Sequence, residues 1–243
     1  MFNNPQDSDI VLEYNGKQVH AHRAILRMSS PFFDRILQSQ WPVCAFELAC
    51  SLSRTDDGQV AKGPVFSLGD DDDPDIIDAM LRHMYNLPYS QSKVFGSDML
   101  KFHVDVFMLA DKYDCPSLRS AAVSNFRRTA DWSISSGFTT AFGSLIKNIA
   151  NLCGSDAVQT ADPSLRDTAL NFCAVSYTKL FTYVEFRAQL HDGSLFDADA
   201  MTKLLVNFGE LALKKDGPRA SSRPLHNGGR NCLGTDIDRG PGR

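Results

Sequence analysis

Residues 8–33 decide the fold, and they read SDIVLEYNGKQVHAHRAILRMSSPFF. Two runs of this stretch, residues 9–14 and 17–21, are rich in β-forming side chains and are separated by Asn15-Gly16. Because this dipeptide tolerates positive φ, it suits the two-residue type I′ turn of a hairpin. The pattern therefore predicts two antiparallel strands joined by a tight turn.

The second half of this stretch changes to a helical period. Apolar residues recur three and four positions apart over residues 22–28, which predicts a short helix. Ser30 suits an N-cap and Pro31 suits a first helical position, so a second helix is expected to follow and to end near Gln38. Its broad apolar face predicts burial of Phe32, Phe33, Ile36 and Leu37.

Residues 64–128 continue with one strand and three helices. The strand is expected at 64–68, and the helices are expected from Pro74, over 97–113, and from Asp114 to Arg128. Asp73, the last of the acidic run Asp70 to Asp73, should cap the first of these helices, where the helix dipole favours carboxylates. The first 128 residues thus predict an α/β (α+β) fold, a small sheet enclosed by short helices.

The rest of the chain shows no strand pattern. Amphipathic spacing predicts helices at about 136–153, 163–191 and 197–213, which together define a helical C-terminal region, residues 130–215. Residues 216–243 contain six Gly, three Pro and five Arg and almost no large aliphatic side chains. Such a composition cannot form a packed core, so the segment is predicted to be a disordered tail.

Composition and charge exclude several classes of partner. A net charge of −4 supplies no basic field for phosphates, so nucleic acid is not an expected partner. No basic segment followed by an apolar run opens the chain, and no eighteen consecutive residues are apolar, so no membrane association is expected. The six cysteines form no CxxC pair, which indicates reduced thiols. These features predict an intracellular protein of the cytoplasm, the nucleus or both.

No residue pattern predicts catalysis, a cofactor or a metal. The chain lacks Gly-x-Ser-x-Gly, a Walker loop, Gly-x-Gly-x-x-Gly and His-Glu-x-x-His. His20-x-His22 is too small a ligand set for zinc, and the acidic run at 70–73 lacks the spacing of a calcium loop. Cys115 begins a helix and is either a reactive thiolate or a small packing residue. A small enzyme or scaffold of an unfamiliar class remains the alternative to a binding protein.

Three segments together resemble the BTB/POZ domain family. Residues 8–33 resemble its opening, FSLGDDDDPDIIDAMLRHMYNLPY (66–89) and VDVFMLADKYDCPSL (104–118) continue it in register, and the version is similar to stand-alone fungal BTB proteins. The resemblance implies a BTB/POZ domain over residues 1–128, a non-enzymatic module that forms homodimers or heterodimers or docks protein partners. Some members of the family deliver substrates to a cullin-type ubiquitin ligase.

The resemblance also implies one pair of site residues. Asp9 and Arg23 fall where the family places a charged pair in the pocket at the dimer interface. The alternative is a salt bridge within one domain that positions the first helix. Both interpretations predict a folding defect when either residue alone is replaced, because the survivor would be left desolvated.

One segment departs from the family pattern. Residues 43–59 are an atypical insertion at the place where the family has a shorter connection, often with a Phe-x-Glu-type element for cullin docking. Phe46-Glu47 lies inside the insertion with the wrong spacing, which weakens the expectation of cullin recruitment. Removing the insertion joins Pro42 to Val60 and restores the family spacing, as expected for a translated intron. A surface loop is the other interpretation, since loop closure entropy grows slowly with length.

Overall fold

The structure, a computed structural model, describes residues 2–38, 64–89, 98–137 and 139–215, apart from the side chains of Asp98 and Lys215. The predicted insertion at 43–59, with Phe46-Glu47, lies outside the described residues. So does the tail predicted at 216–243.

The predicted hairpin is confirmed. Strands β1 (Ile10–Tyr14) and β2 (Lys17–Ala21) pair antiparallel, with Leu12 opposite Val19. The turn residues Asn15 and Gly16 have φ values of 47° and 70°, the positive values that a type I′ turn requires. Strand β3 (Val65–Ser67) pairs parallel to β1 and completes a sheet of order β2-β1-β3.

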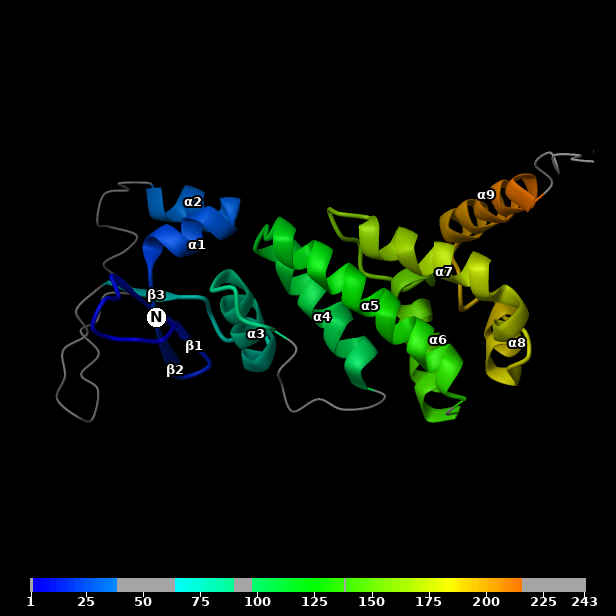
Figure 1. Ribbon diagram of the computed structural model, residues 1–243, viewed down its shortest axis with the longest axis horizontal. Coiled ribbons are helices and arrows are strands. Elements are labelled where there is room, and N and C mark those ends of the chain that lie inside the picture. The colour runs from blue at the N-terminus through cyan, green and yellow to red at the C-terminus, as the bar shows by residue number, and fades with distance from the viewer. Residues whose placement is uncertain (1, 39–63, 90–97, 138, 216–243) are drawn as a thin grey trace, which may run out of the picture.

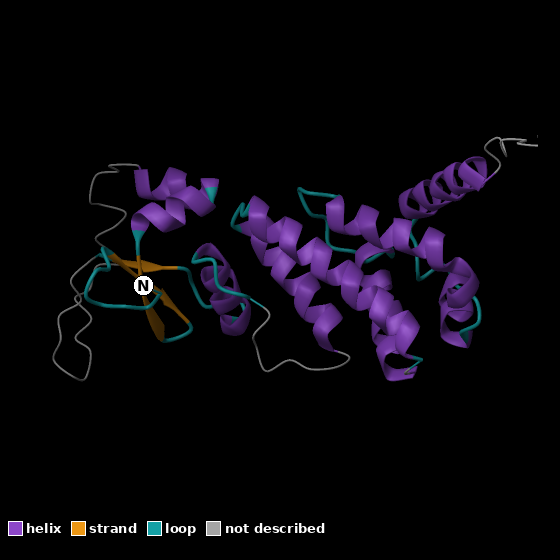
Figure 2. Cartoon of the chain, viewed as in Figure 1, coloured by secondary structure: helices purple, strands orange, loops and turns teal. Residues whose placement is uncertain are grey.

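All other regular secondary structure in the described chain is helical. Figure 1 and Figure 2 show the strands at one end of an elongated molecule, beside α1 to α3, and the later helices extending away from them. None of the described helices is long and apolar enough to cross a bilayer. The helices are α1 (Arg23–Ser29), α2 (Pro31–Gln38), α3 (Pro74–Met84), α4 (Asp98–Lys112), α5 (Pro116–Ser136), α6 (Thr139–Cys153), α7 (Ser164–Leu180), α8 (Val184–His191) and α9 (Ala198–Lys215).

Both predicted N-caps are present. The buried Ser30 hydroxyl accepts a 3.1 Å hydrogen bond from the Phe33 N–H and donates a 2.6 Å bond to the carbonyl of Tyr113. The Asp73 carboxylate accepts a 2.8 Å bond from the Asp75 N–H at the start of α3. Each cap satisfies a helix N–H that has no partner within its own helix. Ser30 also fastens α2 to the end of α4.

Helix α4 runs through the middle of the core, in contact with α3, α5 and α6. Its burial on almost every side explains its high apolar content, although Met108 is only half-buried. The core is continuous from the sheet to α9. The buried residues of α4 are Leu100, Phe102, His103, Val104, Val106, Phe107, Leu109 and Ala110.

Two predicted helix boundaries are wrong. Helix α5 continues past Arg128 to Ser136, because Ala130 and Ser133 are buried at helical spacing and Gly137, at φ 71°, ends the helix. The predicted domain limit at residues 128–130 therefore falls inside α5.

The helix predicted over 163–191 is two helices. The backbone leaves the helical region at Tyr183, whose ring stacks on that of Phe142 in α6. The change of direction at Tyr183 accompanies this ring contact, and helical periodicity does not reveal it. The two pieces are α7 and α8.

Candidate protein interaction surface

Asp9 and Arg23 lie together, but they interact through the main chain. The Asp9 carboxylate accepts a 2.7 Å hydrogen bond from the N–H of Arg23, the first residue of α1. The Arg23 guanidinium donates a 2.7 Å bond to the carbonyl of Leu37 in α2. Asp9 is exposed and Arg23 is half-buried. The pair thus joins β1, α1 and α2, and a role in a dimer pocket stays a prediction.

His22 is a structural residue bonded to Tyr85. The Tyr85 hydroxyl accepts a 2.8 Å bond from the His22 N–H and lies 2.9 Å from Nδ1 of the same residue. Burial is the main cause that raises the pKa of Tyr85. Nδ1 of His20 lies 3.3 Å from the Ser8 hydroxyl. The two imidazoles therefore have separate partners.

The acidic run binds neighbouring parts of the chain. Asp70 accepts a 2.7 Å bond from the N–H of Asn15 in the hairpin turn. Asp72 accepts from Lys112 Nζ at 2.7 Å and from the Tyr113 hydroxyl at 2.9 Å, both at the end of α4. These two carboxylates therefore bind distant parts of the chain, a role that the sequence did not predict, whereas the predicted cap is made by Asp73.

Cys115 has the properties of a packing residue. It is 1% exposed, and burial raises the pKa of its thiol to about 12. The thiol is therefore protonated at neutral pH and a poor nucleophile. Of the two interpretations drawn from the sequence, the structure favours the packing residue.

A charged network joins the BTB-like segments to the later helices. Arg119 of α5 lies 3.6 Å from Asp111 of α4, 3.3 Å from Asp114 and 3.0 Å from Asp162, which precedes α7. Asp111 also accepts bonds from the N–H groups of Ala161 and Asp162 at 2.8 and 3.2 Å. The side chains of Arg119 and Asp111 are 17% and 11% exposed, so this network is largely removed from water.

The network changes the pKa of Asp162. Burial is the largest influence on Asp162 and would raise its pKa, but the Ser164 N–H and the Arg119 guanidinium together lower it below 3.8. Sequence reasoning missed this cluster because Asp162 lies more than forty positions from Arg119 and the members form no motif.

An enzymatic site, the alternative interpretation, would need a cavity with a catalytic lining, and the described residues form a candidate cavity. It has a volume of about 500 Å³ and lies over α4 and α6. Its titratable lining residues are Asp105 and Asp156, and none of the residues that line it is a His, Cys or Lys. Asp105 is moreover paired with Lys101, 2.5 Å away. The lining therefore lacks a nucleophile beside an imidazole or amine base.

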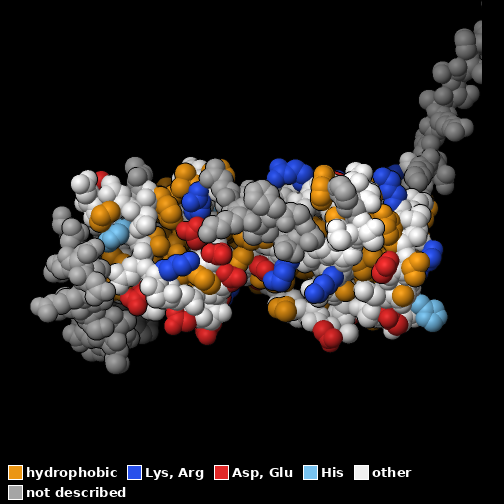
Figure 3. Space-filling view, turned by 90° about the horizontal axis from the view of Figure 1, so that it is seen from below, with side chains coloured by type: hydrophobic (Ala, Val, Ile, Leu, Met, Phe, Trp, Pro, Cys, Tyr) orange, Lys and Arg blue, Asp and Glu red, His pale blue; other side chains and the backbone are white. Residues whose placement is uncertain are grey.

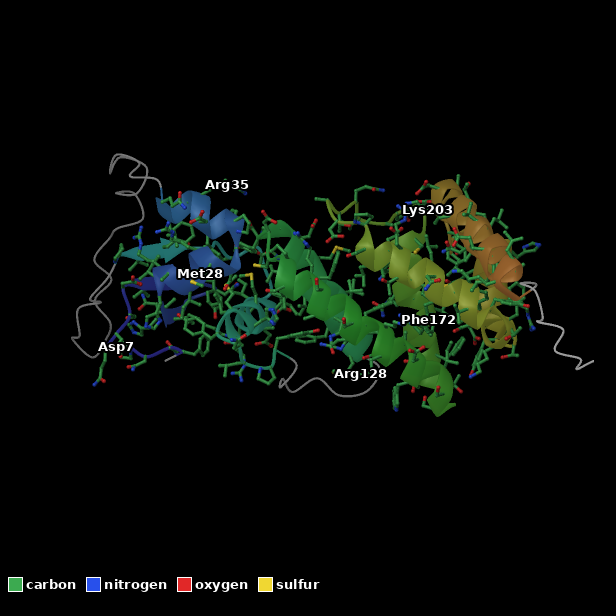
Figure 4. The ribbon with its side chains drawn as sticks, turned by 45° about the horizontal axis from the view of Figure 1, so that its top comes forward. Asp7, Met28, Arg35, Arg128, Phe172 and Lys203 are labelled. Atoms are coloured by element: carbon green, nitrogen blue, oxygen red, sulfur yellow. The ribbon has the colours of Figure 1, made fainter. Side chains whose placement is uncertain are left out.

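The exposed face of α1 carries an apolar side chain without cover. Met28 is 88% exposed. It is the only exposed large hydrophobic residue among the described residues up to 129. Ala24, one turn earlier, is exposed as well, whereas Leu26 is the residue of α1 that is buried. Figure 4 labels Met28 on this helix. The helical spacing in the sequence predicted α1 but not which side faced out.

Charged residues of both signs are spread over one face of the molecule (Figure 3). On the face shown in Figure 3, Lys and Arg are interspersed with Asp and Glu.

Residues 1–129 match the BTB/POZ domain family, and the chain belongs to this family. The match covers the hairpin, the sheet and helices α1 to α4, and it ends within α5. BTB/POZ domains are protein–protein interaction modules, which places the chain among binding proteins. No curated protein matches the chain.

Proposed function

We propose that the chain acts by binding rather than by catalysis, as a BTB-type adaptor that forms a homodimer through α1. The observation that carries the proposal is the 88% exposure of Met28. Transfer of a Met side chain out of water is worth roughly 1.5–3 kcal/mol, so a partner that covers it gains affinity. A twofold dimer would bring Met28 of both copies to the same apolar contact.

The surroundings of Met28 support a preformed contact surface. Arg27 is held by Asp34 of α2 at 3.0 Å, and Asp9 and Arg23 join α1 to β1 and α2. The backbone of α1 is thus held from two sides while its outer face stays exposed. In this proposal Asp9 and Arg23 support the interface by positioning α1.

The two-part architecture supports adaptor activity. A dimer through α1 leaves the long helical part, α5 to α9, available to bind another protein (Figure 1). Delivery of such a protein to a cullin-type ligase stays a prediction from the family resemblance. Residues 39–63, where the family carries its docking element, lie outside the described part of the chain.

Met28→Lys is expected to weaken self-association roughly tenfold or more, because it removes the apolar anchor and places two cations near the twofold axis. Lysine suits the last turn of α1, where the helix dipole favours a cation, so folding should be retained. Sedimentation velocity over a range of protein concentrations measures the effect as a lower weight-average mass.

Val158→Lys is the matched control, since Val158 is 69% exposed but lies in the loop before α7. This variant should keep the mass of the unmodified chain. If Met28→Lys keeps that mass too, the α1 dimer is refuted. Circular dichroism verifies that both variants are folded.

A further inference from the structure

Helix α9 packs on the molecule through one face only. It contacts α7, where Phe208 meets Tyr177 edge to face at 5.3 Å between ring centroids. Its start is held by Asp197, which accepts from the Ala200 N–H and from Arg166 of α7. In Figure 1 α9 lies at the opposite end of the molecule from the sheet. The residues of the packed face are Ala200, Met201, Leu204, Phe208 and Leu211.

A second face of α9 is uncharged and exposed. Leu205, Val206 and Leu213 are 62%, 56% and 76% exposed. A surface helix ordinarily has one apolar stripe and a polar opposite face, so a second apolar stripe on α9 indicates a missing partner. We call this face the α9 stripe. It consists of Thr202, Leu205, Val206, Gly209, Ala212 and Leu213, at spacings of three and four.

A row of four charges runs along one edge of the α9 stripe. In chain order the charges are negative at Asp199, positive at Lys203, negative at Glu210 and positive at Lys214. All four side chains are exposed, and Figure 4 labels Lys203 on this helix. The sequence of signs is antisymmetric about the middle of the helix, between residues 206 and 207.

We propose that the α9 stripe is a second self-association surface, on which α9 of another copy packs antiparallel. A twofold axis between residues 206 and 207 sets Asp199 opposite Lys214 of the second copy. It likewise sets Lys203 opposite Glu210 of the second copy. Every charge of the row then faces its opposite, which favours this register over others.

The antiparallel direction follows from the position of the row. When two such helices face each other antiparallel, their charged rows lie on the same side of the contact and meet. In a parallel pair a twofold axis would put the rows on opposite sides, where they could not pair. Gly209 has no atom within 4 Å of the position of a Cβ, so the helices can approach closely at that point.

The contact should be weak by itself and additive with the α1 dimer. An 18-residue helix is about 27 Å long, so one helix pair forms an interface at the small end of the range for specific complexes. The α1 face and α9 lie in different parts of the molecule (Figure 1). Two different twofold interfaces on one chain join dimers into larger assemblies.

Charge reversal with restoration tests the pairing in the full chain. Because the pair is symmetric, Glu210→Lys and Lys203→Glu each place like charges opposite one another at two positions of the contact. Each variant should therefore weaken the association roughly tenfold. The double variant Lys203→Glu/Glu210→Lys should return it to within about twofold of the unmodified chain, because opposite charges face again. Sedimentation velocity provides the association constants.

Two further variants isolate the α9 stripe. Leu205→Gln removes apolar contact without a charge and should weaken association as well. Lys147→Glu, an equal charge change at an exposed position of α6, should not. Lys203 is 3.6 Å from both Asp167 and Asp199 within its own chain, but these pairs are exposed and contribute little to folding.

Combination with Met28→Lys separates this proposal from the α1 dimer. Each α9 variant is measured with and without Met28→Lys, so the two interfaces are scored independently. The α9 proposal is overturned if the single α9 variants associate as the unmodified chain does. It is also overturned if the double variant is no better than the single ones, which would be the result if another protein or another segment of the chain covered the stripe.

Discussion

Replacing Arg119 by methionine is expected to lower the free energy of unfolding by about 3–5 kcal/mol, the usual effect of removing one partner from a buried ionic network. Methionine keeps much of the length and apolar stem of the side chain, so the change isolates the guanidinium. Asp111 and Asp162 would be left close together and without their cation, in a site where Asp111 is only 11% exposed. Chemical denaturation measures the change.

Arg127→Met is the matched control. Arg127 lies on the same helix with an exposed side chain, so its loss should change stability by no more than about 0.5 kcal/mol. Hydrogen exchange provides a second measurement, because Ala161 and Asp162 donate their N–H groups to Asp111. In Arg119→Met these two amides should exchange faster than in the control. Equal stability of the two variants would show that the network does not hold the helical part to the BTB domain.

Short-range chemistry explains what the sequence predicted well. Asn15-Gly16, Ser30 and Asp73 act on backbone groups within three residues of themselves, and the structure has the predicted turn and both caps. The family resemblance rested on these same segments and is confirmed over residues 1–129. Local signals of this kind predict most of the fold of the first half of the chain.

Long-range contacts explain what the sequence did not predict. At the turn between α7 and α8, Tyr183 contacts Phe142, and Asp162 contacts Asp111 and Arg119. Each of these partners lies some forty or fifty positions away, so no local window contains both sides of the contact. Such contacts stabilise the second half of the fold, and the helix limits predicted from local patterns were wrong there.

The candidate site also combines features that the sequence predicted with features that depend on long-range contacts. The resemblance placed Asp9 and Arg23 together, and the structure does so through a main-chain bond that residue types alone do not specify. The exposure of Met28 and of the α9 stripe depends on which face of each helix is covered by its neighbours. Helical periodicity finds an apolar face but does not say whether another part of the same chain covers it.

Acidification from pH 6.5 to about 4 is expected to lower the free energy of unfolding by about 3 kcal/mol through His103 alone. His103 is fully buried in α4, and burial, followed by the charge of Arg128, lowers its pKa to about 4. The Tyr89 hydroxyl lies 3.1 Å from Nδ1 and itself accepts a bond from Asn125. Among the described residues no group bonds Nε2, so a second proton there has no acceptor.

The sign of the effect follows from the two states. The unfolded chain binds the proton near pH 6.5, whereas the folded chain resists it until pH 4, so falling pH favours unfolding between these values and has no such effect above pH 6.5. His83, whose pKa is also lowered by burial, adds a contribution of the same sign. Asp162 and Asp197 have pKa values below 3.8 in the folded chain, so their losses come mainly at lower pH.

His103→Gln tests this assignment by denaturation at a series of pH values. Glutamine retains a polar group for Tyr89 but cannot titrate, so most of the loss between pH 6.5 and 4 should disappear, leaving the smaller slope due to His83. His191→Gln, at the exposed end of α8, is the control and should keep the full loss. Stability curves of the same shape for His103→Gln and the unmodified chain would show that another group causes the acid sensitivity, because the imidazole in α4 would then bind its proton at the same pH in both states.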